Sequence, residues 1–380
     1  MYVQHLSVAD FRSWPRVDVA FEPGVSVLIG SNGEGKTNLL EAIGYLSTLS
    51  SHRVAADAPL IRAGAGQAVV QAAVVSEGRQ LVLEIEIAAG RANRAKLNRS
   101  PIARPRDLLG GLRTVLFAPE DLAIVRGDPA ERRRFLDDVL VQRIPRLAGV
   151  RADYDRVLKQ RTALLKTAGL ARRSGSSGDL RTLDVWDGHL AQHGAELLVA
   201  RLELVQALAP YVRQAYAQLA PASGKLGLRY VNSAAEAEGN DTDVIPSIEA
   251  ARQALQAACE RMRSAELERG VTLVGPHRDE LAISLNDLPV RGYASHGEGW
   301  SAALALRLAC YRLLTADGTE PVLILDDVFA ELDTARREQL AALAAEAEQS
   351  LISAAVLSDV PEMLGGARYQ VADGEVRRAG

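Results

Sequence analysis

A glycine-rich segment with the sequence GSNGEGKT, at residues 30–37, constrains the fold of this chain more than any other feature. It fits the pattern GxxxxGK followed by Ser or Thr at every fixed position. An apolar run at residues 25–29 precedes it, and apolar residues at helical spacing follow it. Glycines let backbone N–H groups turn toward phosphate oxygens, and the start of a helix adds partial positive charge. The segment predicts a strand, a phosphate-binding loop and a helix; the alternative is a glycine-rich turn that binds nothing.

Two side chains of this segment carry the predicted chemistry. Lys36 is expected to reach the β- and γ-phosphates of ATP and to act as a catalytic residue, and the Thr37 hydroxyl is a hard oxygen ligand suited to Mg²⁺. The candidate ATP-binding residues here are Gly30, Ser31, Asn32, Gly33, Glu34, Gly35, Lys36, Thr37 and Asn38.

A second apolar run, VLIL at residues 322–325, ends in the acidic pair Asp326 and Asp327. A buried strand of this kind delivers carboxylates to one edge of a sheet. We expect Asp326 to hold Mg²⁺, directly or through water, and Asp327 to orient or deprotonate an attacking water. Glu331 and Asp333 follow closely and are alternative bases. Taken alone, the acidic pair is also consistent with a helix cap after a core strand.

The hydrophobic pattern differs between the ends of the chain and its middle. Short apolar and alternating runs typical of strands occupy both ends, whereas residues 130–262 are rich in Ala, Leu and Arg at helical spacing. Polar gaps at residues 171–179 and 232–243 interrupt the helical part and are predicted to be loops. The pattern predicts one α/β domain made from both ends of the chain, with a mostly helical domain inserted. The expected parts are residues 1–120, 121–270 and 271–380.

Positive charge is concentrated in one stretch. The net charge of the chain is only −4, but residues 91–173 carry twenty Lys/Arg against nine Asp/Glu, a local charge of +11, so the rest carries −15. Such a stretch suits a polyanion, although long helices often carry solvated arginines. The candidate DNA-contacting residues are Arg126, Arg132, Arg133, Arg134, Arg143 and Arg146.

Composition excludes several other classes. The two cysteines, Cys259 and Cys310, form no CxxC motif, which argues against a disulfide framework or a structural zinc. No apolar run reaches the roughly 18 residues of a membrane span, and no secretion signal is visible at the N-terminus. A cytoplasmic location is therefore expected.

Several longer segments, taken in order, resemble the RecF family of bacterial recombinational-repair ATPases, of the SMC/ABC-type class. The phosphate-loop pattern is shared by many ATPases, whereas the segments around residues 117–137 and 274–279 are far more specific. The matching segments are residues 30–43, 117–122, 125–129, 132–137, 273–279, 294–298 and 326–333.

The resemblance implies an ABC-type ATPase head of mixed sheets and helices, with a short helical lid in place of a long coiled coil. It implies a homodimer that forms on ATP, in which Ser295, Gly297 and Glu298 form a signature that engages the partner's nucleotide. An N-terminal arginine lies near the nucleotide in related heads, and Arg12 matches it; a simple surface turn is the alternative.

The resemblance also implies a biological role. A weak, DNA-stimulated ATPase would recognise gapped DNA or single-strand/double-strand junctions, and would help RecO and RecR load RecA during repair and the SOS response. Two alternatives remain open: an SMC-like clamp or scaffold with negligible turnover, and an ATPase subunit of an ABC transporter.

The sequence departs from the family pattern in two places. Gly299 and Trp300 stand where RecF proteins commonly have Gln and Arg, so fewer side-chain donors are expected at the signature. Near residues 352–355 only Ser353 carries a hydroxyl, where family members usually have threonines, so sensing of the γ-phosphate from this segment is in doubt.

Overall fold

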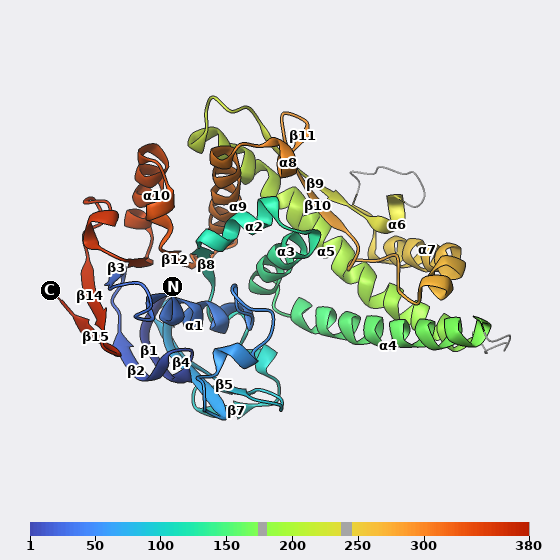
Figure 1. The fold of residues 1–380 in the computed structure, drawn as a ribbon, viewed down its shortest axis with the longest axis horizontal. Coiled ribbons are helices and arrows are strands. Elements are labelled where there is room, and N and C mark those ends of the chain that lie inside the picture. Colours follow the sequence, from blue (N-terminus) through green and yellow to red (C-terminus); the bar gives the residue numbers. More distant parts are fainter. Residues whose placement is uncertain (174–180, 237–244, 380) are drawn as a thin grey trace.

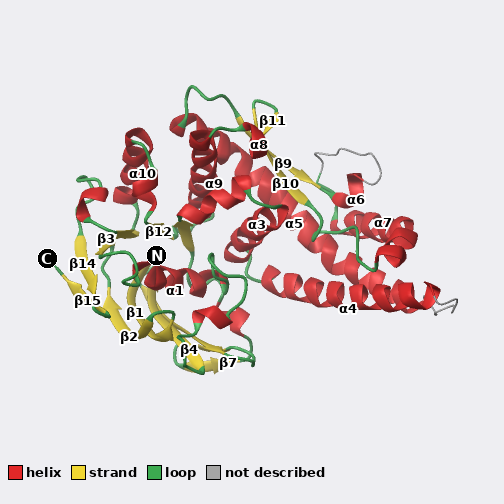
Figure 2. Cartoon of the chain, in the orientation of Figure 1, coloured by secondary structure: helices red, strands yellow, loops and turns green. Residues whose placement is uncertain are grey.

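The structure is a computed structural model that describes residues 1–173, 181–236 and 245–379 (Figure 1). Both ends of the chain build a head with two sheets, and helices from the middle extend away from it to one side (Figure 2). Of the two predicted polar loops, residues 174–179 and 237–243 lie outside the described residues. Within the described ranges, no helix is long and apolar enough to cross a membrane.

The first sheet of the head is antiparallel, with the strand order β2-β1-β4-β5-β6-β7. Its strands are β1 (Tyr2–Phe11), β2 (Trp14–Ala20), β4 (Gln67–Ser76), β5 (Arg79–Ala88), β6 (Arg94–Leu97) and β7 (Ser100–Ile102). Strands β4 and β5 form a hairpin, and Glu77 and Gly78 form its turn with positive φ angles. Buried residues alternate along β4, so one face of the sheet packs on the core.

The second sheet is mixed, with the order β15-β14-β3-β13-β12-β8. Its strands are β3 (Gly24–Ile29), β8 (Thr114–Phe117), β12 (Val322–Asp326), β13 (Gln349–Ala354), β14 (Ala367–Ala372) and β15 (Glu375–Arg378). Strands β14, β3, β13, β12 and β8 run parallel, and only β15 is antiparallel to its neighbour. The carboxyl ends of β3, β13 and β12 therefore meet at one edge.

Strand β12 joins the two cores of the molecule. Val322 and Ile324 face the core shared with α1 (Lys36–Thr48) and the antiparallel sheet. Leu323 and Leu325 face the core shared with the helices α9 (His296–Ala316) and α10 (Thr334–Glu346) and with the middle of the chain. All four side chains are fully buried. A parallel strand covered on both faces reads as a continuous apolar run, which explains the sequence VLIL.

The middle of the chain forms the lid. Its helices and strands are α2 (Leu122–Arg126), α3 (Pro129–Arg143), α4 (Leu147–Arg173), α5 (Arg181–Leu219), α6 (Ser233–Glu236), α7 (Ile248–Arg269), β9 (Leu226–Val231), β10 (Glu280–Leu285), β11 (Leu288–Pro289) and the short turn α8 (Val290–Tyr293). Short 3₁₀ turns lie at Ala58–Leu60, Pro105–Leu108, Pro119–Asp121, Val328–Glu331 and Leu357–Asp359. Helix α5 is the central helix of the lid, because it packs against α4, α7, α9 and β9.

The mostly helical middle also contains a three-stranded sheet that the sequence analysis did not predict. Strand β9 pairs with β10, and β10 pairs with β11, so this sheet crosses the expected boundary at residue 270. The partner of β9 lies about fifty residues further along the chain, where local periodicity cannot reveal it. The short alternating run LGLRYV is thus a strand within an otherwise helical region.

A buried ionic cluster ties the lid helices together. Arg161 of α4 donates to Asp187 of α5 and to Glu266 of α7, both at 2.6 Å, and to the hydroxyl of Thr272 at 3.0 Å. All four residues are buried, so each charge depends on its partners for solvation.

Substitution Arg161→Leu is expected to destabilise the protein by about 3–5 kcal/mol, because it removes the counter-charge of the buried Glu266 and one of the two arginine partners of Asp187, which keeps Arg263. Arg156→Ala is the matched control on the same helix, since Arg156 is largely exposed and its ion pair with Asp153 lies at the surface. Chemical denaturation followed by circular dichroism measures both. Equal, small losses for the two variants would show that the cluster does not hold the lid.

Candidate nucleotide site

The loop after β3 has the shape that its glycines require. Gly30 has no room for a side chain, because a Cβ atom there would lie 2.2 Å from the carbonyl oxygen of Val371. Gly35 has a φ of 95°, and a Cβ there would lie 2.7 Å from Nε1 of Trp14. The Trp14 indole N–H donates to the Gly35 carbonyl at 3.0 Å and buttresses the loop. The expected order of strand, loop and helix is confirmed.

Lys36 lies at the centre of this loop. Its ammonium group donates to the carbonyl oxygens of Gly30 at 2.7 Å and Ser31 at 3.2 Å, and the residue is only 3% exposed. Ser31, Asn32 and Gly33 at the tip of the loop are exposed. The charge is therefore held where a phosphate chain wrapped by the loop would pass.

A hydrogen-bonded group joins the loop to the acidic pair. The Thr37 hydroxyl donates to Oδ1 of Asp326 at 2.9 Å, although 289 positions separate them in the chain. The Ser353 hydroxyl donates to the same oxygen at 2.6 Å and accepts the backbone N–H of Asp327 at 2.9 Å. Strand register accounts for this contact, since Asp326 and Ser353 are direct partners in the β12–β13 pair.

The carboxyl group of Asp326 is strongly perturbed. Burial raises its pKa to about 6; the hydrogen bonds from Ser353 and Thr37 lower it, and the nearby charges of Asp327 and Glu120 raise it. A hydroxyl and a carboxylate oxygen 2.9 Å apart, next to the phosphate loop, are hard donors of the kind that Mg²⁺ takes. The donor set thus fits a magnesium ion shared with a nucleotide.

Asp327 differs from its neighbour. Its backbone has a φ of 48°, in the left-handed region, which ends the strand and turns the chain into the following 3₁₀ turn. Among the described residues, its carboxylate makes no hydrogen bond or ion pair, so both oxygens are free to accept from a water. Asp333, the alternative base, instead caps α10 and accepts from the backbone and guanidinium of Arg336.

Arg12 and Asn38 lie at the side of the loop helix. Arg12 has a φ of 54° and makes a two-point ion pair with the buried Glu41 of α1, with N–O distances of 2.8 and 2.6 Å. Asn38 donates to Ser13 and accepts from Arg53. These contacts attach the antiparallel sheet to α1, and a direct contact of Arg12 with nucleotide stays a prediction.

The predicted signature begins helix α9. The Ser295 hydroxyl accepts the backbone N–H of Glu298 at 3.3 Å, and the Glu298 carboxylate accepts the backbone N–H of Ser295 at 2.8 Å, which is a capping box. Ser295 is exposed and Gly297 partly so. No hydrogen bond or ion pair links either residue to the loop at 30–37 anywhere in the described ranges.

The predicted DNA-contacting arginines do not share one environment. Arg132 is 5% exposed and forms a bidentate ion pair, so its guanidinium is committed to the fold. Five of the six are engaged within the chain: Arg132 with Glu280, Arg133 with the carbonyl oxygen of Asp279, Arg134 with Asp138, Arg143 with Asp317 and Arg146 with Glu196. The sixth, Arg126, is exposed at the end of α2.

Sequence reasoning gave Glu120 no role, and it considered Ser353 only in connection with sensing of the γ-phosphate. Glu120 follows β8, the neighbour of β12, and its charge acts on Asp326. Ser353 positions both acids through one hydroxyl. Only the parallel register brings these residues to Asp326, and no local pattern encodes it.

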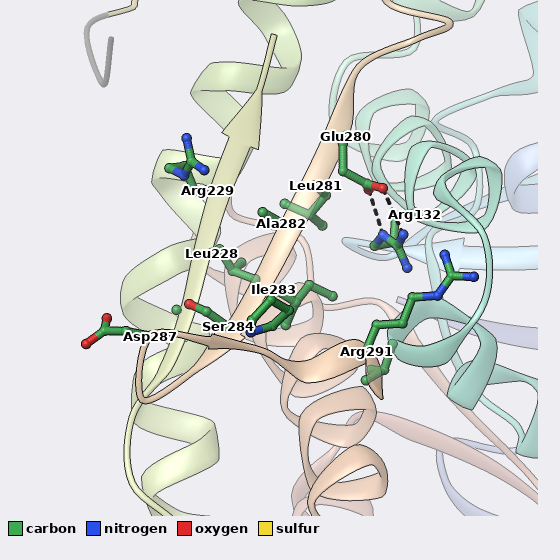
Figure 3. Close-up of a pocket in the computed structure, with 13 residues that line it drawn as sticks. Arg132, Leu228, Arg229, Glu280, Leu281, Ala282, Ile283, Ser284, Asp287 and Arg291 are labelled. Atoms are coloured by element: carbon green, nitrogen blue, oxygen red, sulfur yellow. Dashed lines mark hydrogen bonds and ion pairs between the residues drawn. The ribbon is translucent and has the colours of Figure 1, made fainter. Parts of the chain in front are cut away.

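A cavity of about 570 Å³ lies elsewhere, on the small-residue face of the lid sheet at Gly227, Ala282 and Ser284 (Figure 3). The ion pair of Arg132 and Glu280 lines one side of it. No residue of the phosphate loop lines this cavity, so it is separate from the nucleotide site.

The chain is similar to known proteins over its whole length. Residues 2–368 match the family described as "RecF/RecN/SMC N terminal domain". The chain is 61% identical to "DNA replication and repair protein RecF" from Frankia alni and 60% identical to the protein of that name from Streptomyces avermitilis, with 100% of each chain covered.

Solved structures agree with this similarity. One described as "Structure of the recombination mediator protein RecF-ATP in RecFOR pathway" matches with a TM-score of 0.89 at 28% identity, covering 100% of this chain and 98% of that one. An Smc head domain from Pyrococcus furiosus matches with a TM-score of 0.52 at 17% identity, covering 100% of this chain and 96% of that one, and shares the fold.

Substitution Asp326→Asn is expected to stabilise the nucleotide-free protein at pH 8 by about 3 kcal/mol. A carboxyl whose pKa is raised by folding destabilises the fold once it ionises, so this cost is fully present above about pH 6 and shrinks toward pH 5. An amide oxygen can still accept from Thr37 and Ser353. Thermal unfolding at both pH values, with the exposed Asp107→Asn as control, measures the effect. A destabilised Asn variant at pH 8 would contradict it.

Proposed function

The chain belongs to the RecF family of DNA replication and repair proteins, with an ABC-type ATPase head, and we propose that it binds and hydrolyses ATP as a DNA-binding dimer that forms on ATP. The observation that carries the proposal is the hydrogen bond between Thr37 and Asp326. It joins the two segments that an ATPase of this kind needs, one for phosphate and one for metal and water.

Each residue of the site has a proposed task. Lys36 neutralises charge on the β- and γ-phosphates, and backbone N–H groups of residues 30–37 orient them. Thr37 and Asp326 hold Mg²⁺, which when bound neutralises phosphate charge. Asp327 accepts a proton from, or orients, the attacking water, because its carboxylate has no other partner among the described residues. Ser353 positions Asp326 and the backbone of Asp327.

Two copies are proposed to close around ATP. The exposed Ser295 accepts a hydrogen bond in its capping box, so its own O–H proton remains free to donate to a phosphate oxygen. Gly297 places no side chain over the first turn of α9, so a phosphate can approach its backbone. The Glu298 carboxylate accepts from the backbone N–H of Ser295 and holds the capping box in place. Because no hydrogen bond or ion pair among the described residues joins this turn to its own phosphate loop, a second copy is the proposed source of the phosphate.

DNA is the proposed polymer that this protein binds. The similar structure is described as a recombination mediator in the RecFOR pathway. By that likeness, we propose binding at gapped DNA or single-strand/double-strand junctions, slow hydrolysis stimulated by DNA, and cooperation with RecR and RecO in loading RecA. We propose that the protein carries out these activities in the cytoplasm. Of the predicted arginines, the exposed Arg126 and Arg146 are the proposed candidates for contact with DNA, and Arg132 is buried in the fold.

Light scattering is expected to show a doubling of mass when Mg²⁺-ATP is added. Lys36→Arg should weaken ATP binding and so prevent the doubling. Ser295→Arg should bind ATP normally yet stay monomeric, because the bulky cation blocks only the partner's phosphate. A Ser295→Arg protein that dimerises like the wild type would contradict the shared site.

Steady-state hydrolysis separates an ATPase from an SMC-like scaffold with negligible turnover. We expect a low rate that rises with junction DNA, and a fall of about 100-fold or more in Asp327→Asn, which removes the proposed base. Equal, near-zero rates for wild type and variant would favour the scaffold instead.

The affinity of the protein for DNA should fall steeply as the salt concentration rises.

A further inference from the structure

Arg126 lies against the first turn of the signature helix. The residue is the last of α2, and it is exposed. Its Nη1 atom is 3.3 Å from Nδ1 of His296, the residue after Ser295. Nothing else among the described residues forms a hydrogen bond or an ion pair with its guanidinium. A cation of the lid thus stands next to the proposed phosphate contact of the head.

The contact with His296 does not satisfy this guanidinium. Nε2 of His296 faces the indole N–H of Trp300 at 3.1 Å, and an indole can only donate. A neutral imidazole has one acceptor nitrogen, so it cannot accept from Trp300 and Arg126 together. The buried indole N–H of Trp300 needs Nε2 of His296 as its acceptor. His296 therefore offers no acceptor to Arg126, whose five N–H donors are left without one.

Gly299 makes room for this arrangement. A Cβ atom at position 299 would lie 3.2 Å from Nε and 3.5 Å from Nη2 of Arg126. A Gln at this position would occupy the space that the guanidinium now fills. The two departures from the family pattern, Gly299 and Trp300, therefore act together: one admits Arg126 and the other turns His296 toward it.

We propose that Arg126 binds the terminal phosphate of the ATP held by the partner copy, alongside Ser295 of the same chain. The inference rests on the proposed function, because it requires two copies that share nucleotide. The planar fork of a guanidinium matches two phosphate oxygens at once, and a charged bond of this kind is stronger than one from a neutral amide. Arg126 thus supplies the donors that the signature side chains at 299 and 300 lack.

The position favours nucleotide over DNA as the source of the phosphate. Arg126 lies beside His296 and Gly299, within the first helical turn after Ser295, so a phosphate at the Ser295 hydroxyl lies on the same side as the guanidinium. Arg126 should therefore act without DNA present. If it served a DNA backbone instead, its loss would reduce DNA affinity and leave ATP-dependent assembly intact.

Dimerisation in Mg²⁺-ATP without DNA is the direct test. Arg126→Ala is expected to raise the dimer dissociation constant on the order of tenfold or more. Arg126→Lys should lie in between, because it keeps the charge and loses the fork. ATP affinity of the dilute monomer, from fluorescence titration, should not change. Arg291→Ala is the control, since it removes a cation from the neighbouring turn α8 that pairs with Asp128. If Arg126→Ala assembled like Arg291→Ala, the inference would fail while the shared site stood.

Mixed dimers test whether Arg126 serves the partner's nucleotide. When Lys36→Ala chains are mixed with Arg126→Ala chains, each mixed dimer has two shared nucleotide sites. In one of them the intact loop of one chain faces the intact signature and Arg126 of the other. ATP turnover of the mixture should exceed that of either variant alone. Lys36→Ala mixed with Ser295→Arg is the reference pair. Rescue in the reference pair but not with Arg126→Ala would overturn the inference; no rescue in the reference pair would overturn the shared site itself.

Discussion

The hydrogen bond from Thr37 to Asp326 depends on one constraint, the parallel register of β3, β13 and β12. Strands that run in parallel end at the same edge, so a loop after the first and an acid at the end of the last meet there. That requirement explains why both ends of the chain are needed for one sheet. It also explains the fully apolar VLIL run, because a strand in the middle of such a sheet is covered on both sides.

The segments most specific to the family are joined to one another inside the lid. Arg201 of α5 makes a bidentate ion pair with Asp137 of α3 and donates to the carbonyl oxygen of Pro276 at 2.7 Å. Burial lowers the pKa of His277 to about 4, so the ring is neutral and is held by hydrogen bonds to Tyr154 and Thr272. These residues read from sequence as motifs, and in the structure they tie α3, α4 and α5 to the segment that precedes β10.

Local sequence sufficed for the parts of the site that are local. The order of strand, loop and helix around residues 30–37 could be predicted because neighbouring residues encode it. The role of Ser353 could not, since it follows from pairing with Asp326 across a sheet. Strand β9 was missed for the same reason. Arg126 beside Gly299 joins positions 173 apart in the chain, and nothing at either position points to the other.

The central claim is that each copy lends its signature to the nucleotide of the other. The most direct measurement is the structure of the Asp327→Asn protein loaded with Mg²⁺-ATP. We predict a two-fold dimer in which the Ser295 hydroxyl lies within hydrogen-bond distance of the γ-phosphate held by the partner copy. A nucleotide whose γ-phosphate contacts only its own chain, with Ser295 in solvent, would contradict the claim.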